Sequence, residues 1–325
     1  MKPYSFVLFI FSALLLIACS PKIQPSKEAF RPATLQEAQF QAPDGVDLPL
    51  KTWKSLDPEK AIVIAVHGFN DYRNGFAFPA SWWMQRGITT IAYDQRSFGE
   101  SENVGVWPGT EQLLNDLSQI VSLVRQKNPD SPIYLLGESM GGAVVMTAVT
   151  QPGFPAVDGI ILSAPAVWGW KSLNPFYRTS LWAAAHLFPS WTASGSGLGI
   201  QASDNISVLR NLGRDPLFIK ETRIDAVYGL VGLMDRAYDS AENLKLPLLV
   251  LYGANDEIIP KSPVEDVVAR LPKSADVVLY EDGWHLLMRD LQAEVVWNDI
   301  ESWIKTRSIP SGNEVNQLPL FASRD

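Results

Sequence analysis

The sequence predicts an α/β fold built on a mostly parallel central sheet. Six short runs are apolar throughout, without the alternation of a half-exposed strand, which is typical of strands covered by helices on both faces. These runs are 61–66, 88–93, 133–136, 159–162, 248–252 and 277–280. Segments with helical periodicity lie between them, as in 110–127, where six apolar residues fall on one face. This alternation predicts an open sheet whose ligand site lies at the carboxyl ends of the strands.

Composition narrows the class of protein. The chain has 325 residues, of which 46% are hydrophobic and 19% charged, and its net charge is −8. This length provides for one large domain or two small ones with an ample core. The negative charge disfavours nucleic acid as a partner, and it disfavours an anionic membrane bound through a basic surface. One cysteine and three histidines argue against a Cys/His zinc site.

The first 18 residues predict an export signal. Lys2 gives a positive start, and residues 6–18 are almost wholly apolar but fall short of the ~20 residues that a spanning helix needs. The run ends in a sequence that resembles the bacterial lipoprotein cleavage motif, in which lipid is attached to the cysteine, here Cys19. The resemblance implies a lipid-anchored protein of the bacterial cell envelope, and Ser20 favours the outer membrane, facing the periplasm. An ordinary cleaved signal and an uncleaved short anchor are the alternatives.

Residues 19–43 contain several prolines and predict a tether to a domain that spans 44–306, followed by a tail at 307–325. Residues 165–243 interrupt the alternation of predicted strands and helices, because they contain no clear strand and many aromatic residues. An insertion of this length predicts a helical cap. Trp168 and Trp170, just past a strand end, are predicted to contact an apolar substrate; the alternative is that the cap aromatics form a core of their own.

Residues 137–142 form a G-x-S-x-G motif around Ser139, directly after the run 133–136 and before a helical segment. In this context of strand, sharp turn and helix, the serine hydroxyl is exposed above the sheet. Glycines flank the serine because a Cβ there would collide with neighbouring backbone. The motif predicts a nucleophile, and the alternative is a purely structural turn.

A serine nucleophile needs a base, and the base is oriented by a carboxylate. In folds with this motif the chain order is serine, acid, histidine. His285 is the one histidine that follows Ser139 outside the predicted cap, since His186 lies within the cap and His67 precedes the serine. His285 is therefore the predicted base.

Asp256 is the predicted acid, because it follows the run 248–252 at a strand end from which a carboxylate can reach the histidine. Glu257 and Asp94 are its rivals. The reaction also needs backbone donors for an oxyanion. We expect them to be the amides of Met140, next to the nucleophile, and of Phe69, in the loop after the run 61–66.

The order of these motifs resembles that of the α/β-hydrolases, and in particular the monoacylglycerol lipase and lysophospholipase family, also labelled serine aminopeptidase S33-like. The blocks that carry the resemblance are 67–68, 94–101, 137–142, 253–256 and 283–285. The resemblance covers about residues 40–306 and implies Ser139, Asp256 and His285 as the catalytic triad. Three features depart from the family pattern: Glu138 stands where histidine is usual, Ser97 where glycine is frequent, and residues 69–72 (FNDY) where many lipases have small residues and a second histidine.

We therefore expect a serine hydrolase that cleaves carboxylic esters of apolar or lipid-like substrates, of monoacylglycerol or lysophospholipid type, through an acyl-enzyme. No metal or cofactor is required. The alternatives are an S33-like peptidase, an acyltransferase, and a non-catalytic binding module of the envelope. A peptidase would need carboxylates in the cap to hold a free amine, and Asp225, Asp235 and Glu242 are the candidates there.

Overall fold

The computed structural model describes residues 20–25, 27–195, 197, 199–313 and 315. The predicted signal segment and Cys19 lie outside the described residues.

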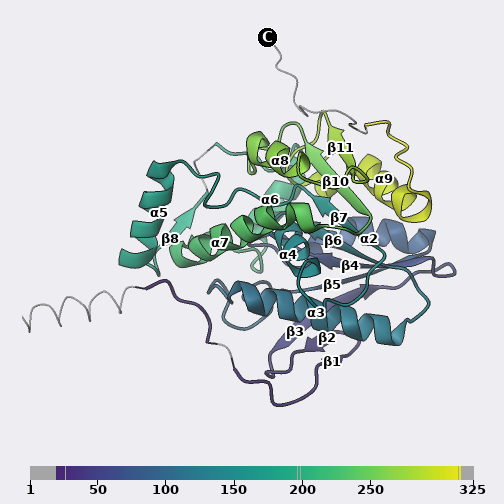
Figure 1. Ribbon diagram of the computed structural model, residues 1–325, viewed down its shortest axis with the longest axis horizontal. Helices are drawn as coiled ribbons and strands as arrows, with labels where there is room; N and C mark the ends of the chain where they lie inside the picture. Colours follow the sequence, from purple (N-terminus) through teal and green to yellow (C-terminus); the bar gives the residue numbers. More distant parts are fainter. Residues whose placement is uncertain (1–19, 26, 196, 198, 314, 316–325) are drawn as a thin grey trace, which may run out of the picture.

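A nine-stranded sheet forms the centre of the molecule, in the order β1-β2-β3-β5-β4-β6-β7-β10-β11 (Figure 1). From β5 to β11 all neighbouring strands are parallel, whereas β1, β2 and β3 pair antiparallel. The strands are β1 Thr34–Leu35, β2 Gln39–Gln41, β3 Asp47–Trp53, β4 Ala61–Val66, β5 Ile88–Tyr93, β6 Ile133–Glu138, β7 Gly159–Ser163, β10 Leu248–Gly253 and β11 Asp276–Tyr280. All six predicted strands are present, and the predicted fold class is confirmed.

Helices cover both faces of this sheet. The helices on the two faces are α2 Ala77–Trp83, α3 Thr110–Lys127, α4 Met140–Val149, α7 Ile224–Ser240, α8 Lys261–Val268 and α9 Ala293–Thr306. Two more helices, α5 Pro175–Leu187 and α6 Ile206–Arg214, belong to the insertion between β7 and β10. One core lies between the sheet and α3, α4, α7 and α8, and a second lies between the sheet and α2 and α9. Alternate residues of β4 enter the two cores, Ile62 and Ile64 the first, Val63 and Ala65 the second. Burial on both faces is why these strands show no polar alternation.

The segment predicted as a tether is held against the domain. Residues 34–41 contain β1 and β2, which extend the sheet, and the amide of Gln24 donates to the carbonyl of Trp107 at 2.9 Å. Strands of two and three residues are too short to carry a recognisable periodicity. The start of the predicted tail is held as well, since the amide of Val315 donates to the carbonyl of Val277 in β11 at 2.8 Å.

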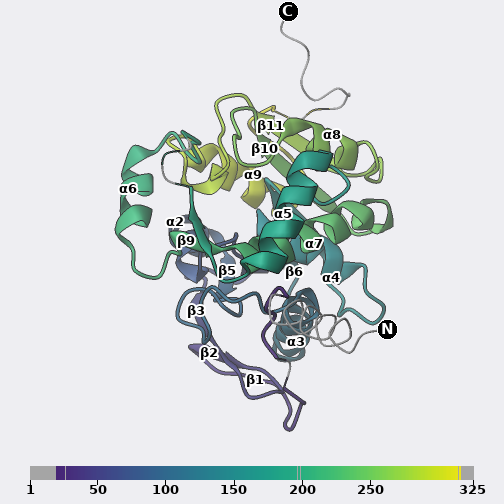
Figure 2. The same cartoon turned by 90° about the vertical axis from the view of Figure 1, so that its left-hand side faces the viewer.

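The insertion between β7 and β10 differs in two ways from the predicted cap. It contains a small antiparallel pair, β8 Thr192–Ser194 and β9 Glu221–Arg223, where no strand is expected. Its last helix, α7, packs on α4 and contributes Val231, Leu233 and Ala237 to the main core, so α7 belongs to the helical layer of the domain. The part that rises above the sheet runs from α5 through α6 to β9 (Figure 2).

Candidate active site

Ser139 occupies the sharp turn between β6 and α4. Its φ of 54° and ψ of −117° are a strained conformation for a residue with a side chain. The turn is fixed by two backbone hydrogen bonds: the Ser139 amide donates to the Ser163 carbonyl at 2.9 Å, and the Ala166 amide donates to the Ser139 carbonyl at 3.0 Å. This geometry places the serine at the carboxyl edge of the sheet, at the start of a helix.

The glycines of the motif are required by close backbone approach. A Cβ on Gly141 would lie 1.9 Å from the carbonyl oxygen of Val66, and a Cβ on Gly137 would lie 2.5 Å from the carbonyl oxygen of Gly141. Neither position has room for a side chain. The sequence therefore keeps glycine at both positions so that the serine can turn out of the sheet.

His285 and Asp256 form the hydrogen bond expected of a base and its orienting acid. Nδ1 of His285 lies 2.8 Å from Oδ2 of Asp256, and the Asp256 side chain is fully buried. The other carboxylate oxygen accepts from the amides of Ile258 at 2.8 Å and Ile259 at 3.0 Å. The N–H at Nδ1 of His285 is the third donor to this carboxylate. Nε2 of His285 therefore carries no proton and can accept the one from the serine hydroxyl. Ser139 and His285 line one cavity.

The rival acids are engaged elsewhere. The carboxylate of Glu257 accepts from the amide of Gln201 at 2.6 Å, and Asp94 forms an ion pair with Arg73. Among the described residues, the carboxylate hydrogen-bonded to the imidazole of His285 is that of Asp256.

The other two histidines have structural partners. Nδ1 of His186 lies 2.7 Å from the carbonyl of Trp182 within α5. His67 is fully buried: Nε2 accepts from the Gln95 amide at 3.0 Å, so Nδ1 carries the proton and donates to the carbonyl of Gly68 at 2.8 Å. Burial lowers the pKa of His67 and keeps it neutral. The imidazole thus holds the loop that follows β4.

That loop passes directly over the nucleophile. A Cβ on Gly68 would lie 3.3 Å from Cβ and 3.9 Å from Oγ of Ser139, and the next residue, Phe69, lines the same cavity as Ser139. The Phe69 ring packs against Phe98, with ring centroids 5.6 Å apart. Met140 is the first residue of α4, and its amide is one of the unpaired donors at a helix N-terminus. Both predicted oxyanion donors lie beside Ser139.

A cavity of about 590 Å³ contains Ser139 and His285. Most of its wall is apolar and comes from the cap and the strand ends. These apolar residues are Ala166, Trp168, Ile200, Ala202, Leu209, Leu212, Phe218, Leu230, Met234, Ile258, Ile259 and Leu286. Three polar side chains that also line this cavity, Asp71, Glu138 and Arg289, form one ion-paired cluster, which with the neighbouring Asn70 we call the polar end of the cavity. The cavity therefore suits a molecule with one apolar and one polar part.

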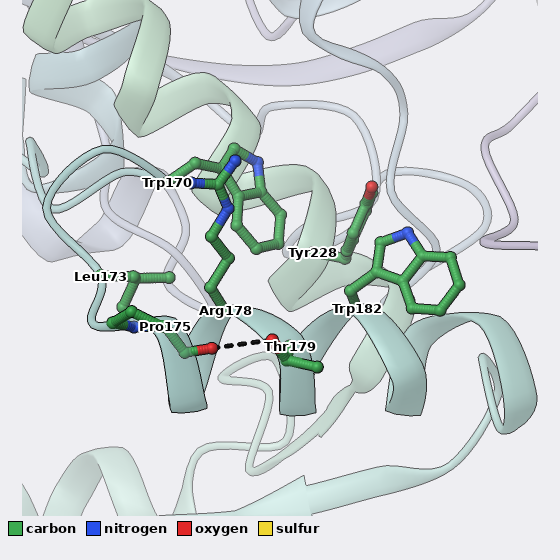
Figure 3. Close-up of a pocket in the computed structure, with 7 residues that line it drawn as sticks. All are labelled: Trp170, Leu173, Pro175, Arg178, Thr179, Trp182 and Tyr228. Carbon is green, nitrogen blue, oxygen red and sulfur yellow. Dashed lines mark hydrogen bonds between the residues drawn. The ribbon is translucent and has the colours of Figure 1, made fainter.

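The two tryptophans predicted to contact substrate are separated in the structure. Trp168 lines the catalytic cavity, whereas Trp170 lines a second groove of about 440 Å³ between α5 and α7 (Figure 3). In that groove the Trp170 ring lies 4.9 Å from the ring of Tyr228, with Arg178 and Trp182 alongside. The two residues lie on different sides of the chain although they are only two positions apart.

A buried ion cluster at the polar end was not predicted. The guanidinium of Arg289 lies 2.6 Å from Asp71 and 2.7 Å from Glu138, and all three side chains are at most 4% exposed. Burial raises the pKa of the Glu138 carboxyl, and Arg289 acts in the opposite direction. The cluster joins the loop after β4, the nucleophile turn and the segment four residues beyond His285. Two sequence signals point to it: Glu138 departs from the family pattern, and Arg289 stands with Asp290 in the otherwise apolar stretch 286–291.

Comparison with known proteins agrees with this geometry. Human monoglyceride lipase is 26% identical over 281 residues, covering 83% of this chain and 90% of that enzyme. Phospholipase YtpA of Bacillus subtilis is 26% identical over 216 residues, covering 66% of this chain and 82% of that protein. Among solved structures, the monoacylglycerol lipase of Paleococcus ferrophilus superposes with a TM-score of 0.67 at 21% identity, covering 80% of this chain and 99% of that one. This last similarity supports the fold.

The family model described as serine aminopeptidase, S33, matches residues 57–292, a span that begins before β4 and ends beyond His285. It contains the nucleophile turn, both predicted oxyanion amides, the acid, the base and the whole cap. The chain belongs to the serine aminopeptidase S33 family of α/β-hydrolases.

Proposed function

We propose that this protein hydrolyses carboxylic esters of lipid-like substrates through an acyl-enzyme on Ser139. The observation that carries this proposal is the cavity that Ser139 and His285 share, with its long apolar wall and one charged end. An ester with an acyl chain and a polar alcohol matches both parts of this cavity.

The arrangement supports a two-step reaction. Oγ of Ser139 attacks the ester carbonyl while Nε2 of His285 takes its proton, and Asp256 stabilises the imidazolium that forms. The amides of Phe69 and Met140 donate to the developing oxyanion. His285 then protonates the leaving alcohol, and in the second step it deprotonates a water that releases the acid. The nucleophile, the base, the acid and both oxyanion donors are all groups of this chain.

The substrate class follows from the shape and polarity of the cavity. The apolar wall accommodates an acyl chain, and the polar end accommodates a hydroxyl-bearing or charged alcohol. We infer a single-chain lipid of monoacylglycerol or lysophospholipid type. The names of the relatives, monoglyceride lipase and phospholipase, support this inference.

A peptidase activity is the second candidate, because the family name includes aminopeptidases. The carboxylates expected to hold a free amine are engaged elsewhere: Asp225 pairs with Arg223, and Glu242 pairs with Arg270. Asp235 accepts from the backbone of residue 171. None of the three lines the catalytic cavity as described. The two carboxylates that do line the cavity, those of Asp71 and Glu138, are paired with Arg289, so the site favours esters over peptides.

We further propose that Cys19 carries lipid and attaches the enzyme to a bacterial envelope membrane, in the outer membrane facing the periplasm. The apolar run that ends at this cysteine supports the proposal. Among the residues that the structure describes, no helix is long and apolar enough to cross a membrane.

Two measurements on the full chain test the enzymatic proposal. A fluorophosphonate should label the wild type and not Ser139→Ala, and absence of labelling in the wild type would favour a non-catalytic binding module. A panel of esters of increasing acyl length, with peptidyl amides beside it, should show highest kcat/KM on medium or long esters. Faster cleavage of the amides would show a peptidase. A product formed with an added alcohol in preference to water would show an acyltransferase.

A further inference from the structure

Helix α5 presents its large apolar residues to the outside. Ala185 is its one buried residue, whereas Phe176 is 74% exposed and Tyr177 and Leu187 are each more than half exposed. Helices at a protein surface normally show the reverse pattern, with large apolar residues turned inward. The exposed residues therefore indicate a surface that is covered by something else.

The apolar surface extends beyond the helix. Phe176 and Leu187 are eleven residues apart, which is about three turns and about 17 Å along the same face. Immediately after the helix, Phe188 and Trp191 stack with their ring centroids 4.2 Å apart, and Trp191 is 63% exposed. We call these five residues (Phe176, Tyr177, Leu187, Phe188 and Trp191) the outer cap face.

The charge around this face fits a bilayer. Residues 174–203 contain no aspartate or glutamate, in a chain with 35 acidic residues, and Arg178 is their only lysine or arginine. From 165 to 224 there are six basic residues and three acidic ones. Two of the six, Lys171 and Arg223, pair with carboxylates outside this range, those of Asp239 and Asp225. The carboxylate that lies beside this surface is that of Glu221, which accepts from the Thr192 hydroxyl at 3.2 Å. An aromatic surface with so few acidic side chains is suited to the interface of a membrane.

The described chain also begins at this face. The backbone amide of Lys22 donates to the carboxylate of Asp225 at 3.3 Å, in the first turn of α7. The amide of Ile224, the preceding residue, donates to the carbonyl of Trp191 at 2.8 Å. Lys22 and Trp191 of the outer cap face thus contact two consecutive residues, Asp225 and Ile224. Figure 1 shows the purple start of the chain beneath α5 and β8. Cys19 is three residues before Lys22, a reach of at most about 11 Å.

We propose that the outer cap face inserts into the membrane surface that holds the Cys19 anchor, so that the enzyme contacts the bilayer at two adjacent places. This inference rests on the membrane location proposed above. It has a consequence for the reaction, because Gly195 and Ile200, which follow Trp191 along the chain, line the catalytic cavity. Docking through this face places that side of the cavity next to the bilayer, where a single-chain lipid resides.

The test measures membrane contact at one position of the full chain. A fluorescent dye is placed on a cysteine introduced at Ser180, an exposed position of α5 between Phe176 and Leu187, and a matched variant carries it at Ser81. Ser81 is exposed on α2, on the opposite side of the molecule (Figure 1). Both chains are reconstituted into phosphatidylcholine–phosphatidylglycerol vesicles that contain brominated phosphatidylcholine, and the unsubstituted chain gives the background from Cys19.

We expect bromolipid to quench the dye at 180 severalfold more than the dye at 81. Replacing Phe176, Leu187 and Trp191 by serine should remove that difference and leave hydrolysis of a short soluble ester unchanged, since none of the three lines the catalytic cavity. Phe78→Ser, which removes an exposed phenylalanine of α2 (62% exposed), should change neither measurement.

Three outcomes would overturn the proposal. Equal quenching at 180 and 81 in vesicle-bound protein would show that the anchor holds the chain while the outer cap face stays in water. A chain that does not float with vesicles would overturn the membrane location as well. A dye at 180 that is already shielded without lipid, in a dimer that the serine variant separates, would assign this face to a second copy of the chain.

Discussion

At the scale of single residues, Asp256 and Glu257 adjoin in the sequence but have different surroundings. The Asp256 carboxylate is buried against His285, whereas Glu257 is exposed and contacts the backbone of Gln201. We expect Asp256→Asn to lower kcat by on the order of 10⁴, because the amide no longer stabilises the imidazolium or fixes its tautomer. Steady-state kinetics on a soluble ester would measure this. Glu257→Gln is the matched control and should keep most of the activity; if it is the more damaging change, Asp256 is not the acid.

Arg289 pairs with two buried carboxylates, those of Asp71 and Glu138. Replacing it with methionine leaves both charges buried and unpaired, which costs about 3–5 kcal/mol of folding free energy. Urea unfolding should show this loss. Lys171→Met removes an exposed ion pair with Asp239 and should change stability little, because water screens such pairs. A loss equally small for Arg289→Met would contradict the assignment of the cluster as a buried, structure-holding network.

This cluster also shows why part of the site could not be predicted. The nucleophile turn is a local feature, in which glycines, strand and helix follow one another in the sequence. Asp71, Glu138 and Arg289 come from segments far apart in the chain, and only the folded structure shows that one guanidinium serves both carboxylates. Glu138 is visible in the sequence as a departure from the family pattern, but its partner is not.

At the scale of elements, the predicted strands were the ones buried on both faces. Residues of β4 are all apolar, those of β5 are apolar apart from two threonines, and each strand is recognisable by itself. The antiparallel strands β1 and β2 and the pair β8 and β9 are two or three residues long and mostly not buried. These strands form because of the neighbour that they pair with, so their own residues give little indication in the sequence that a strand is present.

His67, in the loop after β4, should make the stability of the fold decrease at acidic pH. Burial lowers the folded-state pKa of His67 below its ordinary value of 6.5. Below 6.5 the unfolded chain then binds more protons than the folded one, so stability falls with falling pH, by up to about 1.4 kcal/mol per pH unit from this residue. His67→Gln retains an acceptor for the Gln95 amide and cannot titrate.

Unfolding midpoints measured above and below pH 6.5 should therefore depend less on pH in His67→Gln than in the wild type. His186→Gln, in the cap, is the control for loss of a histidine that is not buried. An identical pH dependence in the wild type and His67→Gln would show that His67 does not destabilise the fold on acidification.

The cap should set the preference for acyl length. Trp168 lines the catalytic cavity and Trp170 lines the separate groove, which makes them a matched pair. Each methylene that loses its buried contact costs about 0.8 kcal/mol, so loss of two methylene contacts lowers kcat/KM by about tenfold. We expect Trp168→Ala to lower kcat/KM for decanoate esters by about this factor relative to acetate esters. Trp170→Ala should leave that ratio unchanged, and an equal decline on both esters in Trp168→Ala would assign that residue to the cap core.

At the scale of the whole molecule, attachment to a membrane should depend on Cys19. The run 6–18 is shorter than the ~20 residues that a spanning helix needs, and no described helix can take its place. Cys19→Ser should therefore move the protein from the detergent-requiring membrane fraction to a soluble or precursor form. A metabolic fatty-acid analogue should label the wild type and not this variant, and labelling that persists in Cys19→Ser would refute the lipid anchor. The serine variant of the outer cap face is the control: it should retain the label, because acylation requires the cysteine, whereas docking requires the exposed apolar side chains of that face.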